Sequence, residues 1–147
     1  MPVDLDDIDR RLIDLLRRDG RASYRALGRK LGVAEGTVRK RVKRLVDAGV
    51  IRRFTVELDT SGQVHAISMV SVDPTVPTPK VAERLSSLEG VEKVYEVTGQ
   101  YDALVVISVS NLAELNRCIE EIRTVPGVRE TNTAMILRVI TAEGRSG

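Results

Sequence analysis

The chain has 147 residues, of which 42% are hydrophobic and 30% are charged, and its formal net charge is +2. This composition is typical of one or two globular domains and excludes a disordered chain. No apolar run reaches the roughly 18 residues that a membrane helix needs, and the acidic start is unlike a signal peptide. We therefore expect a cytoplasmic protein that has no membrane partner.

The sequence offers few groups for metal or covalent chemistry. Cys118 is the only cysteine and His65 the only histidine, so they form no cluster that would bind zinc. Neither residue is spaced like a nucleophile with its base, and no phosphate loop or acid–base motif is present. We expect no metal, no cofactor and no catalytic residue, and an enzyme is the weakest of the function classes.

The small net charge hides an uneven distribution. Residues 1–57 contain 15 Lys and Arg against 9 Asp and Glu, whereas residues 58–147 contain 8 against 12. The densest run, from Arg39 to Arg44, places five cations in six positions. Positive charge gathered in one part of a chain attracts polyanions, and nucleic acid is the usual one.

The first helix is predicted in the segment DLDDIDRRLIDLLRRDG. Asp6 is a suitable N-cap, and Asp7 and Asp9 suit the positive end of the helix dipole. The apolar residues recur at i, i+4, i+7 and i+8, which places them on one face of a helix. These residues are Ile8, Leu12, Leu15 and Leu16.

Two further helices are predicted on either side of a short turn. Ser23 caps the segment YRALGRKL, and Gly32 can take the left-handed conformation that ends a helix. The third helix carries the cationic run and stops at Gly49. Its buried stripe consists of Val38, Val42 and Leu45. Two helices joined by a short turn make a helix-turn-helix.

This arrangement points to duplex DNA. The second helix of a helix-turn-helix enters the major groove, where its first residues reach base edges and flanking cations hold phosphates. Gly36 has no side chain and permits close approach to the duplex. The alternative is a solvated helix whose cations balance acidic neighbours, but we expect such neighbours to be missing here. The predicted DNA-binding residues are Ser23, Arg25, Glu35, Gly36, Thr37, Arg39, Lys40, Lys43, Arg44 and Arg53.

The segment IRRFTVEL follows the third helix and predicts a strand. Its apolar residues are Ile51, Phe54 and Val56, so residues 1–57 are expected to form a winged helix-turn-helix domain. Arg52 and Arg53 either add phosphate contacts or are exposed strand residues, and both possibilities stay open. A linker is expected at residues 58–62.

The second half of the chain repeats itself after a shift of 37 residues, under which Gly90 falls on Gly127 and Val91 on Val128. Each copy reads strand, helix, Gly-Val, strand. Two copies predict a βαββαβ domain over residues 63–147, the ferredoxin-like arrangement of the α+β class.

The predicted sheet is expected to be apolar on both faces. Two helices cover one face, and the other face should be polar if it meets water. The segment ALVVISV is nevertheless apolar at almost every position, and AMILRVI near the end is similar. We therefore expect a homodimer through this half, which would also supply two recognition helices. Cover by the N-terminal domain of the same chain is the alternative.

The two halves together resemble the Lrp/AsnC family of transcription regulators. The segment from LDDIDRRLIDLL to RLVDAGVIRRF is similar to the family's helix-turn-helix, and VTGQYDALVVI is similar to the hallmark of its ligand-sensing RAM domain. The resemblance covers nearly the whole chain. It implies a dimerising RAM domain that assembles further into tetramers or octamers, and control by an amino acid bound between neighbouring dimers.

The resemblance also implies the effector-binding residues Gly99, Gln100, Tyr101, Asp102, Thr131 and Thr133. Gly99 allows a turn that exposes backbone N–H groups to a carboxylate, and Asp102 can pair with an ammonium group. The two threonines share one face of the last strand because side chains alternate along a strand. The alternative is an ordinary hairpin connection followed by strand threonines. These residues do not identify the effector.

The sequence favours a sequence-specific DNA-binding transcription regulator. The alternative, from another class, is an amino-acid-sensing assembly module that binds no specific DNA. RNA is a weaker partner, because RNA readers of this fold stack bases on aromatic side chains. Tyr95 and Tyr101 are the only aromatic residues of the second half.

Overall fold

The computed structural model describes residues 3–142. The chain divides into two compact units: the first contains the residues up to Leu58 together with Thr141 and Ala142, and the second runs from Asp59 to Ile140. This boundary falls within the segment that the sequence predicts to be a linker. Each unit has its own hydrophobic core.

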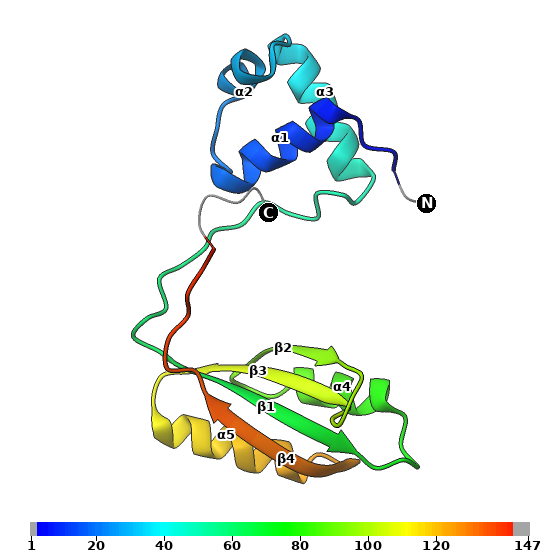
Figure 1. The fold of residues 1–147 in the computed structure, drawn as a ribbon, viewed down its shortest axis with the longest axis vertical. Helices are drawn as coiled ribbons and strands as arrows, with labels where there is room; N and C mark the ends of the chain where they lie inside the picture. Colours follow the sequence, from blue (N-terminus) through cyan, green and yellow to red (C-terminus); the bar gives the residue numbers. More distant parts are fainter. Residues whose placement is uncertain (1–2, 143–147) are drawn as a thin grey trace. The chain divides into compact units, whose positions relative to one another are not determined.

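The first unit is built from three helices: α1 (Asp7–Arg18), α2 (Tyr24–Leu31) and α3 (Glu35–Asp47) (Figure 1). The side chain of Asp6 accepts a hydrogen bond from the Asp9 backbone N–H at 2.8 Å, and Ser23 Oγ accepts one from Ala26 N–H at 3.1 Å. The three predicted helices and both predicted N-caps are therefore confirmed. The core consists of Leu12, Leu27, Leu31, Val38, Val42 and Leu45.

The turn between α2 and α3 depends on two glycines. Gly32 ends α2 with a φ of 72°, the left-handed conformation predicted for it. Gly28 lies against the turn itself, where Val33 N–H donates to Gly28 O at 2.9 Å. A Cβ added at Gly28 would lie 2.6 Å from the carbonyl oxygen of Val33, so the close approach of α2 to the turn requires glycine here.

The predicted strand in residues 51–58 is wrong. No residue from Arg52 to Thr60 lies in a helix or strand, and the four strands of the described chain all begin after residue 63. The apolar side chains of this segment are exposed: Phe54, Val56 and Leu58. An extended segment becomes a strand only when a neighbouring backbone supplies hydrogen-bond partners. Among residues 3–142 none pairs with it, and the helix-turn-helix has no strand-built wing.

The second unit follows the predicted βαββαβ order. Its elements are β1 (Val64–Val72), α4 (Thr78–Ser86), β2 (Val91–Glu96), β3 (Ala103–Val109), α5 (Leu112–Thr124) and β4 (Val128–Met135). The strands form one sheet in the order β2-β3-β1-β4, and every pair is antiparallel. The α+β fold class and the ferredoxin-like arrangement are confirmed.

The internal repeat is visible in the backbone as well. Gly90 and Gly127 occupy equivalent positions before β2 and β4, and their φ angles are 93° and 97°. A Cβ would meet Val109 Cγ1 at 2.8 Å in the first copy and Val81 Cγ2 at 2.7 Å in the second. Both copies therefore need glycine for the same two reasons, a positive φ and a crowded position.

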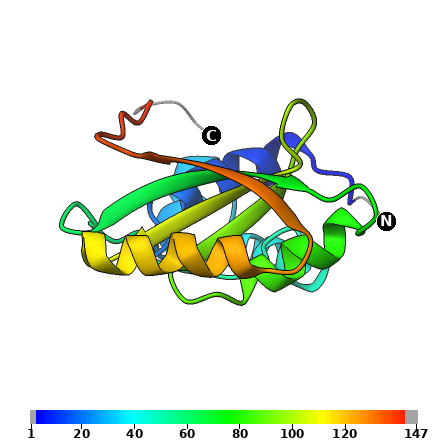
Figure 2. The same ribbon diagram turned by 90° about the horizontal axis from the view of Figure 1, so that it is seen from below.

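Helices α4 and α5 cover one face of the sheet (Figure 2). The strand residues that point to these helices are buried, and they alternate with half-buried residues on the other face. That other face is apolar at its centre, where Ile67 pairs with Val106 and Met69 with Leu104 across β1 and β3. No helix of the second unit's described residues covers it; this surface is called the open face below.

None of the helices in the described part of the chain is both long enough and apolar enough to span a membrane.

Candidate DNA interface and effector site

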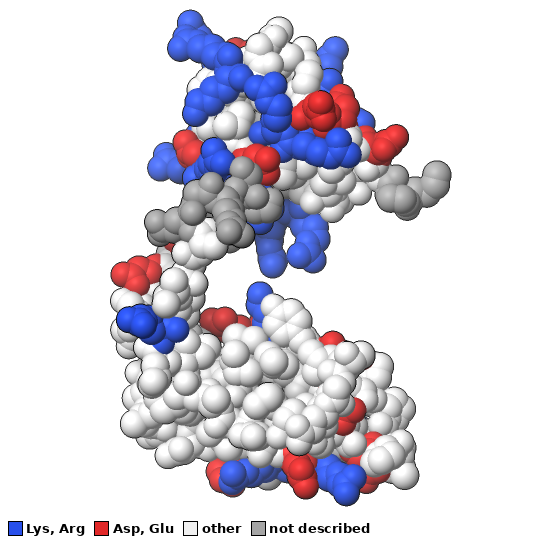
Figure 3. All heavy atoms as spheres, in the orientation of Figure 1, with Lys and Arg blue, Asp and Glu red and all other residues white. Residues whose placement is uncertain are grey.

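Basic side chains gather on the first unit. Figure 3 shows Lys and Arg over much of this unit, whereas the visible face of the second unit is mostly uncharged. The exposed side of α3 carries Gly36, Arg39, Lys40 and Lys43. Since Val38, Val42 and Leu45 fill the core behind them, the fold directs these cations toward solvent.

The other predicted DNA-binding residues are distributed around α3. Ser23 and Arg25 lie exposed at the start of α2, Glu35 is exposed on the first turn of α3, and Thr37 is half-buried. The beginning of α2 and the exposed side of α3 belong to one helix-turn-helix, which suits contacts to a base edge and to flanking phosphates.

The expectation that the cations of α3 lack acidic neighbours is wrong. On the helix itself Arg39 pairs with Glu35 at 3.3 Å and Lys43 with Asp47 at 2.6 Å. Two more carboxylates come from the start of α1, more than thirty residues away in sequence. Of the α3 cations, only Lys40 forms no ion pair with a described residue.

Asp9 lies at the centre of the pairs between α1 and α3. Its side chain is 0% exposed, so it is not the solvated dipole partner that the sequence suggests. Its Oδ1 accepts a hydrogen bond from Arg41 Nη1 at 2.9 Å, and its Oδ2 accepts one from Arg44 Nη2. Asp6 accepts two more from Arg41 Nη1, at 2.8 and 2.7 Å.

The surroundings of Asp9 keep it ionised. Burial by itself would raise the pKa of Asp9, but the hydrogen bonds from Arg44, Arg41 and the Asp6 backbone outweigh burial. The pKa of Asp9 is therefore lowered below the ordinary aspartate value of 3.8. A buried charge persists in this way only when it is paired and hydrogen-bonded.

Tyr24 is a residue that the sequence reasoning missed. The guanidinium of Arg39 lies over its ring, 5.7 Å from the centroid. The same guanidinium donates a hydrogen bond to Glu35 Oε1, one helical turn earlier on α3. The ring and the carboxylate together restrict the directions in which Arg39 can point. The available signal was an aromatic residue directly after the Ser23 cap.

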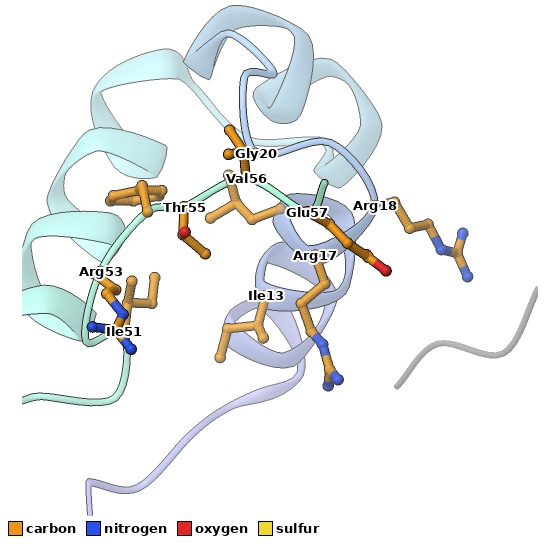
Figure 4. A pocket seen from close by; sticks show the side chains of 11 residues that line it. Ile13, Arg17, Arg18, Gly20, Ile51, Arg53, Thr55, Val56 and Glu57 are labelled. Atoms are coloured by element: carbon orange, nitrogen blue, oxygen red, sulfur yellow. The ribbon is translucent and has the colours of Figure 1, made fainter. Parts of the chain in front are cut away.

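Arg53 does not join the α3 cluster. It lines a hollow of about 450 Å³ between α1 and residues 51–57, together with Ile13, Arg17, Ile51 and Val56 (Figure 4). This hollow is partly apolar, and Arg53 lies on a segment that forms no strand. The geometry thus gives Arg53 no placement shared with the residues of α3.

The predicted effector loop connects β2 and β3. Gly99 has a φ of 114°, and Gln100 beside it is exposed. The loop is closed by a hydrogen bond from Val97 N–H to Asp102 O at 3.0 Å. Asp102 Oδ2 accepts a hydrogen bond from Val72 N–H at 2.8 Å, so half of this carboxylate ties the loop to the end of β1.

The two predicted effector residues of β4 do not contact the predicted effector residue Tyr101. Thr131 and Thr133 are on the helix-covered side, where Thr133 Oγ1 donates to the buried Ser68 Oγ at 2.9 Å. Tyr101 Oη instead accepts a hydrogen bond from Asn132 Nδ2 at 3.2 Å. Asn132 is therefore the β4 residue that meets the loop. The sequence reasoning missed it, although it lies between the two threonines and alternation assigns it to the opposite face.

Within residues 3–142 there is no group of three or more His, Cys, Asp or Glu side chains placed to hold a metal ion.

Comparison with known proteins agrees with the geometry of both units. The family model for the AsnC-type helix-turn-helix domain matches residues 5–46, and the model for the Lrp/AsnC ligand binding domain matches residues 65–145.

Curated relatives match over more than nine tenths of their length. The chain is 38% identical to the HTH-type transcriptional regulator LysM of Sulfurisphaera tokodaii over 93% of this chain and 98% of that protein. It is also 38% identical to the HTH-type transcriptional regulator FL11 of Pyrococcus abyssi, over 94% of this chain and 93% of that one.

Solved structures show the same fold. The leucine response regulatory protein (LrpA) of Mycobacterium tuberculosis is 30% identical, with a TM-score of 0.80 over 94% of this chain and 96% of that one. AsnC of E. coli, at 21% identity, has a TM-score of 0.87 over 99% of this chain and 100% of its own. The chain therefore belongs to the Lrp/AsnC family, as a DNA-binding transcriptional regulator with an N-terminal helix-turn-helix and a C-terminal ligand-binding domain.

Proposed function

We propose that the protein binds operator DNA sequence-specifically through α3, acts as a homodimer or higher assembly, and responds to an amino acid. In this proposal residues 1–57 bind DNA, residues 58–62 are a linker, and residues 63–147 dimerise and sense the effector. The protein acts in the cytoplasm, where its DNA partner lies. The single observation that carries the proposal is the exposed cationic side of α3 within a helix-turn-helix.

The residues of α3 differ in their contacts, which suggests that some read bases and others bind phosphates. Gly36 leaves the start of α3 open for close approach, and Lys40, which forms no ion pair with a described residue, is available to a phosphate. Arg39 is held by Tyr24 and Glu35, so its direction is set before DNA arrives. A restrained guanidinium loses less conformational freedom when it binds the edge of a guanine. These features favour base reading near the start of α3, with phosphate contacts beside it.

The open face supports dimerisation. Ile67, Met69, Leu104 and Val106 form an apolar surface on the second unit, and monomeric proteins rarely leave such a surface to water. A second copy of the chain is the simplest cover, because a twofold axis brings the same surface to both partners. Two copies also present two helices to two half-sites.

An amino acid is the effector class that the comparisons support. The matching family model is a ligand binding domain, and one solved relative, a regulator from Neisseria meningitidis, is described as an L-Met complex. In the loop from Gly99 to Asp102, Gly99 and Gln100 are exposed, and one carboxylate oxygen of Asp102 bonds to no described residue. We assign the ammonium group to Asp102 and a polar contact to Tyr101, with Thr131 and Thr133 as further candidates and Asn132 added by the structure.

The test is fluorescence anisotropy on the protein's own upstream DNA and on scrambled DNA, at several salt concentrations, with and without a panel of amino acids. We expect tighter binding to the upstream DNA and a shift by one amino acid. The Arg39→Ala/Lys43→Ala variant should bind more weakly and show a flatter salt dependence.

The matched control is Lys80→Ala, which removes an exposed cation from α4 in the second unit. It should leave DNA binding unchanged. Equal and weak binding to both DNAs, unaffected by every amino acid, would favour an assembly module that binds no specific DNA. Unchanged binding by the double variant would overturn the assignment of α3.

A further inference from the structure

A basic hollow lies beside α3, on the side that faces the start of α1. It has a volume of about 340 Å³, and it is lined by Asp6, Thr37, Lys40, Arg41 and Arg44. The four α3 residues are spaced i, i+3, i+4 and i+7, so they form one stripe along the helix. This stripe lies next to the residues proposed to enter the major groove, so it would face the duplex backbone in that arrangement.

Buried Asp9 holds both arginines of this hollow in place through hydrogen bonds to their guanidinium groups. Each oxygen of its buried carboxylate binds a different guanidinium, Arg41 at Oδ1 and Arg44 at Oδ2. The side chain of Arg44 is still 48% exposed, against 23% for Arg41. Arg44 uses only Nη2 in this pair, and its Nη1 and Nε donate to no described residue.

The charges around the hollow favour an anion. Three cations, Lys40, Arg41 and Arg44, outnumber the two carboxylates, Asp6 and Asp9. The negative charge of Asp6, which lines the hollow, is offset by two hydrogen bonds from the Arg41 guanidinium. Lys40 and the free edge of Arg44 are the charged donors left for a ligand, and the Thr37 hydroxyl adds a neutral one.

We propose that this hollow binds one phosphate of the DNA backbone in each half-site, through Lys40, Arg44 and the Thr37 hydroxyl. Asp9 is a positioning residue that aims the guanidinium of Arg44 at that phosphate. The inference rests on the proposed binding of DNA through α3, and it adds a defined phosphate contact and a buried acid that sets it up.

Replacing Asp9 tests the positioning role, because the two possible effects of the substitution change DNA affinity in opposite directions. Asp9→Asn removes a negative charge beside a DNA-binding helix, so charge alone predicts tighter binding to DNA. Loss of positioning predicts weaker binding, because Arg44 is then no longer held toward the phosphate. Asp7→Asn is the matched control, since Asp7 lies on the same turn of α1, is almost fully exposed and, among the described residues, pairs only with Arg10.

The experiment measures affinity for the upstream duplex with single methylphosphonate substitutions, each of which removes the charge of one phosphate. In the unmodified protein one position per half-site should weaken binding by roughly tenfold, as expected for a charge-assisted hydrogen bond. Arg44→Ala should weaken binding to the natural duplex by a similar factor, lose the sensitivity at that position alone and lower the salt slope by about 1 per site.

Asp9→Asn should reproduce the Arg44→Ala profile, and Asp7→Asn should keep the profile of the unmodified protein. Identical profiles for the unmodified protein and Arg44→Ala would overturn the phosphate site. Unchanged or tighter binding by Asp9→Asn, with the sensitive position retained, would overturn the positioning role.

Folding of each variant is checked by thermal unfolding in circular dichroism. If Asp9→Asn does not fold, Thr37→Val replaces it, with the expectation of weaker binding and reduced sensitivity at the same phosphate. Absence of binding to every duplex would reject the proposed function and this inference together, whereas DNA binding with a uniform methylphosphonate profile would reject this inference alone.

Discussion

At the scale of single residues, Arg41 and Arg44 share Asp9 but contribute differently to stability. Arg41 is the less exposed and also binds Asp6, so its removal leaves buried Asp9 with Arg44 as its one cationic partner among the described residues, and Asp6 with none. We predict that Arg41→Met lowers the free energy of unfolding by about 2 kcal/mol, because a buried charge that loses one of its two cationic partners is strongly destabilised.

Urea unfolding followed by helical circular dichroism measures this loss. Arg39→Met is the control, because Arg39 and Glu35 form an exposed i,i+4 pair that is worth about 0.5 kcal/mol or less. Equal losses for the two variants would show that Asp9 does not depend on Arg41.

Acid should weaken the same pairs. Since hydrogen bonds from the two arginines lower the pKa of Asp9 below 3.8, ionised Asp9 contributes stability that is complete above 3.8, the unfolded value, and is lost as the pH falls through the lower folded pKa. We predict a steep fall in the stability of the first unit in this range. In Asp9→Asn the fall should be shallower, and urea unfolding at a series of pH values from 5 to 2 checks it.

The sequence did not predict that Asp9 is buried. It indicated the position of Asp9 in a helix, but not the residues that pair with it. A carboxylate on the first turn of a helix is ordinarily read as a solvated dipole partner. The arginines that bury it are more than thirty residues away and became its neighbours only through the packing of α3 on α1. The same distance hid the contact between Tyr101 and Asn132.

At the scale of elements, the turn of the helix-turn-helix can be separated from its DNA-facing surface with two glycine-to-alanine substitutions. Gly28→Ala puts a methyl group 2.6 Å from a backbone oxygen of the turn. We predict a loss of about 1–3 kcal/mol in the free energy of unfolding, since the backbone must move to relieve such overpacking.

Gly36→Ala is the matched substitution on α3, where an added Cβ meets nothing within 4 Å. It should raise the free energy of unfolding by about 0.5–1 kcal/mol, because alanine favours a helix over glycine. If the duplex approaches this backbone closely, DNA affinity should fall at the same time. Thermal unfolding and anisotropy on the two variants measure both effects, and unchanged affinity would place Gly36 away from the duplex.

Helices can be predicted from local sequence more completely than strands. The spacing of Leu12, Leu15 and Leu16 and the caps at Asp6 and Ser23 are local, and the predicted helices follow them. The segment around Phe54 and Val56 has strand-like composition, yet a strand also needs a partner, and composition does not provide one. The βαββαβ unit was predictable because its repeat supplied four strands that pair with one another.

At the scale of the whole molecule, the open face predicts the state of assembly. Val106→Glu places a charge in the centre of this face, and a buried unpaired carboxylate opposes association strongly. We expect the variant to sediment as a monomer at concentrations where the unmodified protein is a dimer, and to bind DNA more weakly because only one helix engages.

Leu112→Glu is the control for this variant. Leu112 is an exposed apolar residue at the start of α5, away from the open face, so the same charge there should leave the dimer intact. Circular dichroism confirms folding of both variants. A dimer that persists in Val106→Glu would show that another surface joins the subunits.

The strand order has a consequence for how the chain acquires its structure during synthesis. The contacts of α1, α2 and α3 all lie within the first 47 residues, so this bundle can form once Asp47 has left the ribosome. The central strand β1 instead pairs with β3 and β4, and one of its edges stays without a partner until Met135 has been made. The half of the nascent chain that carries the ligand-binding domain thus folds last, and it needs protection from aggregation for longest.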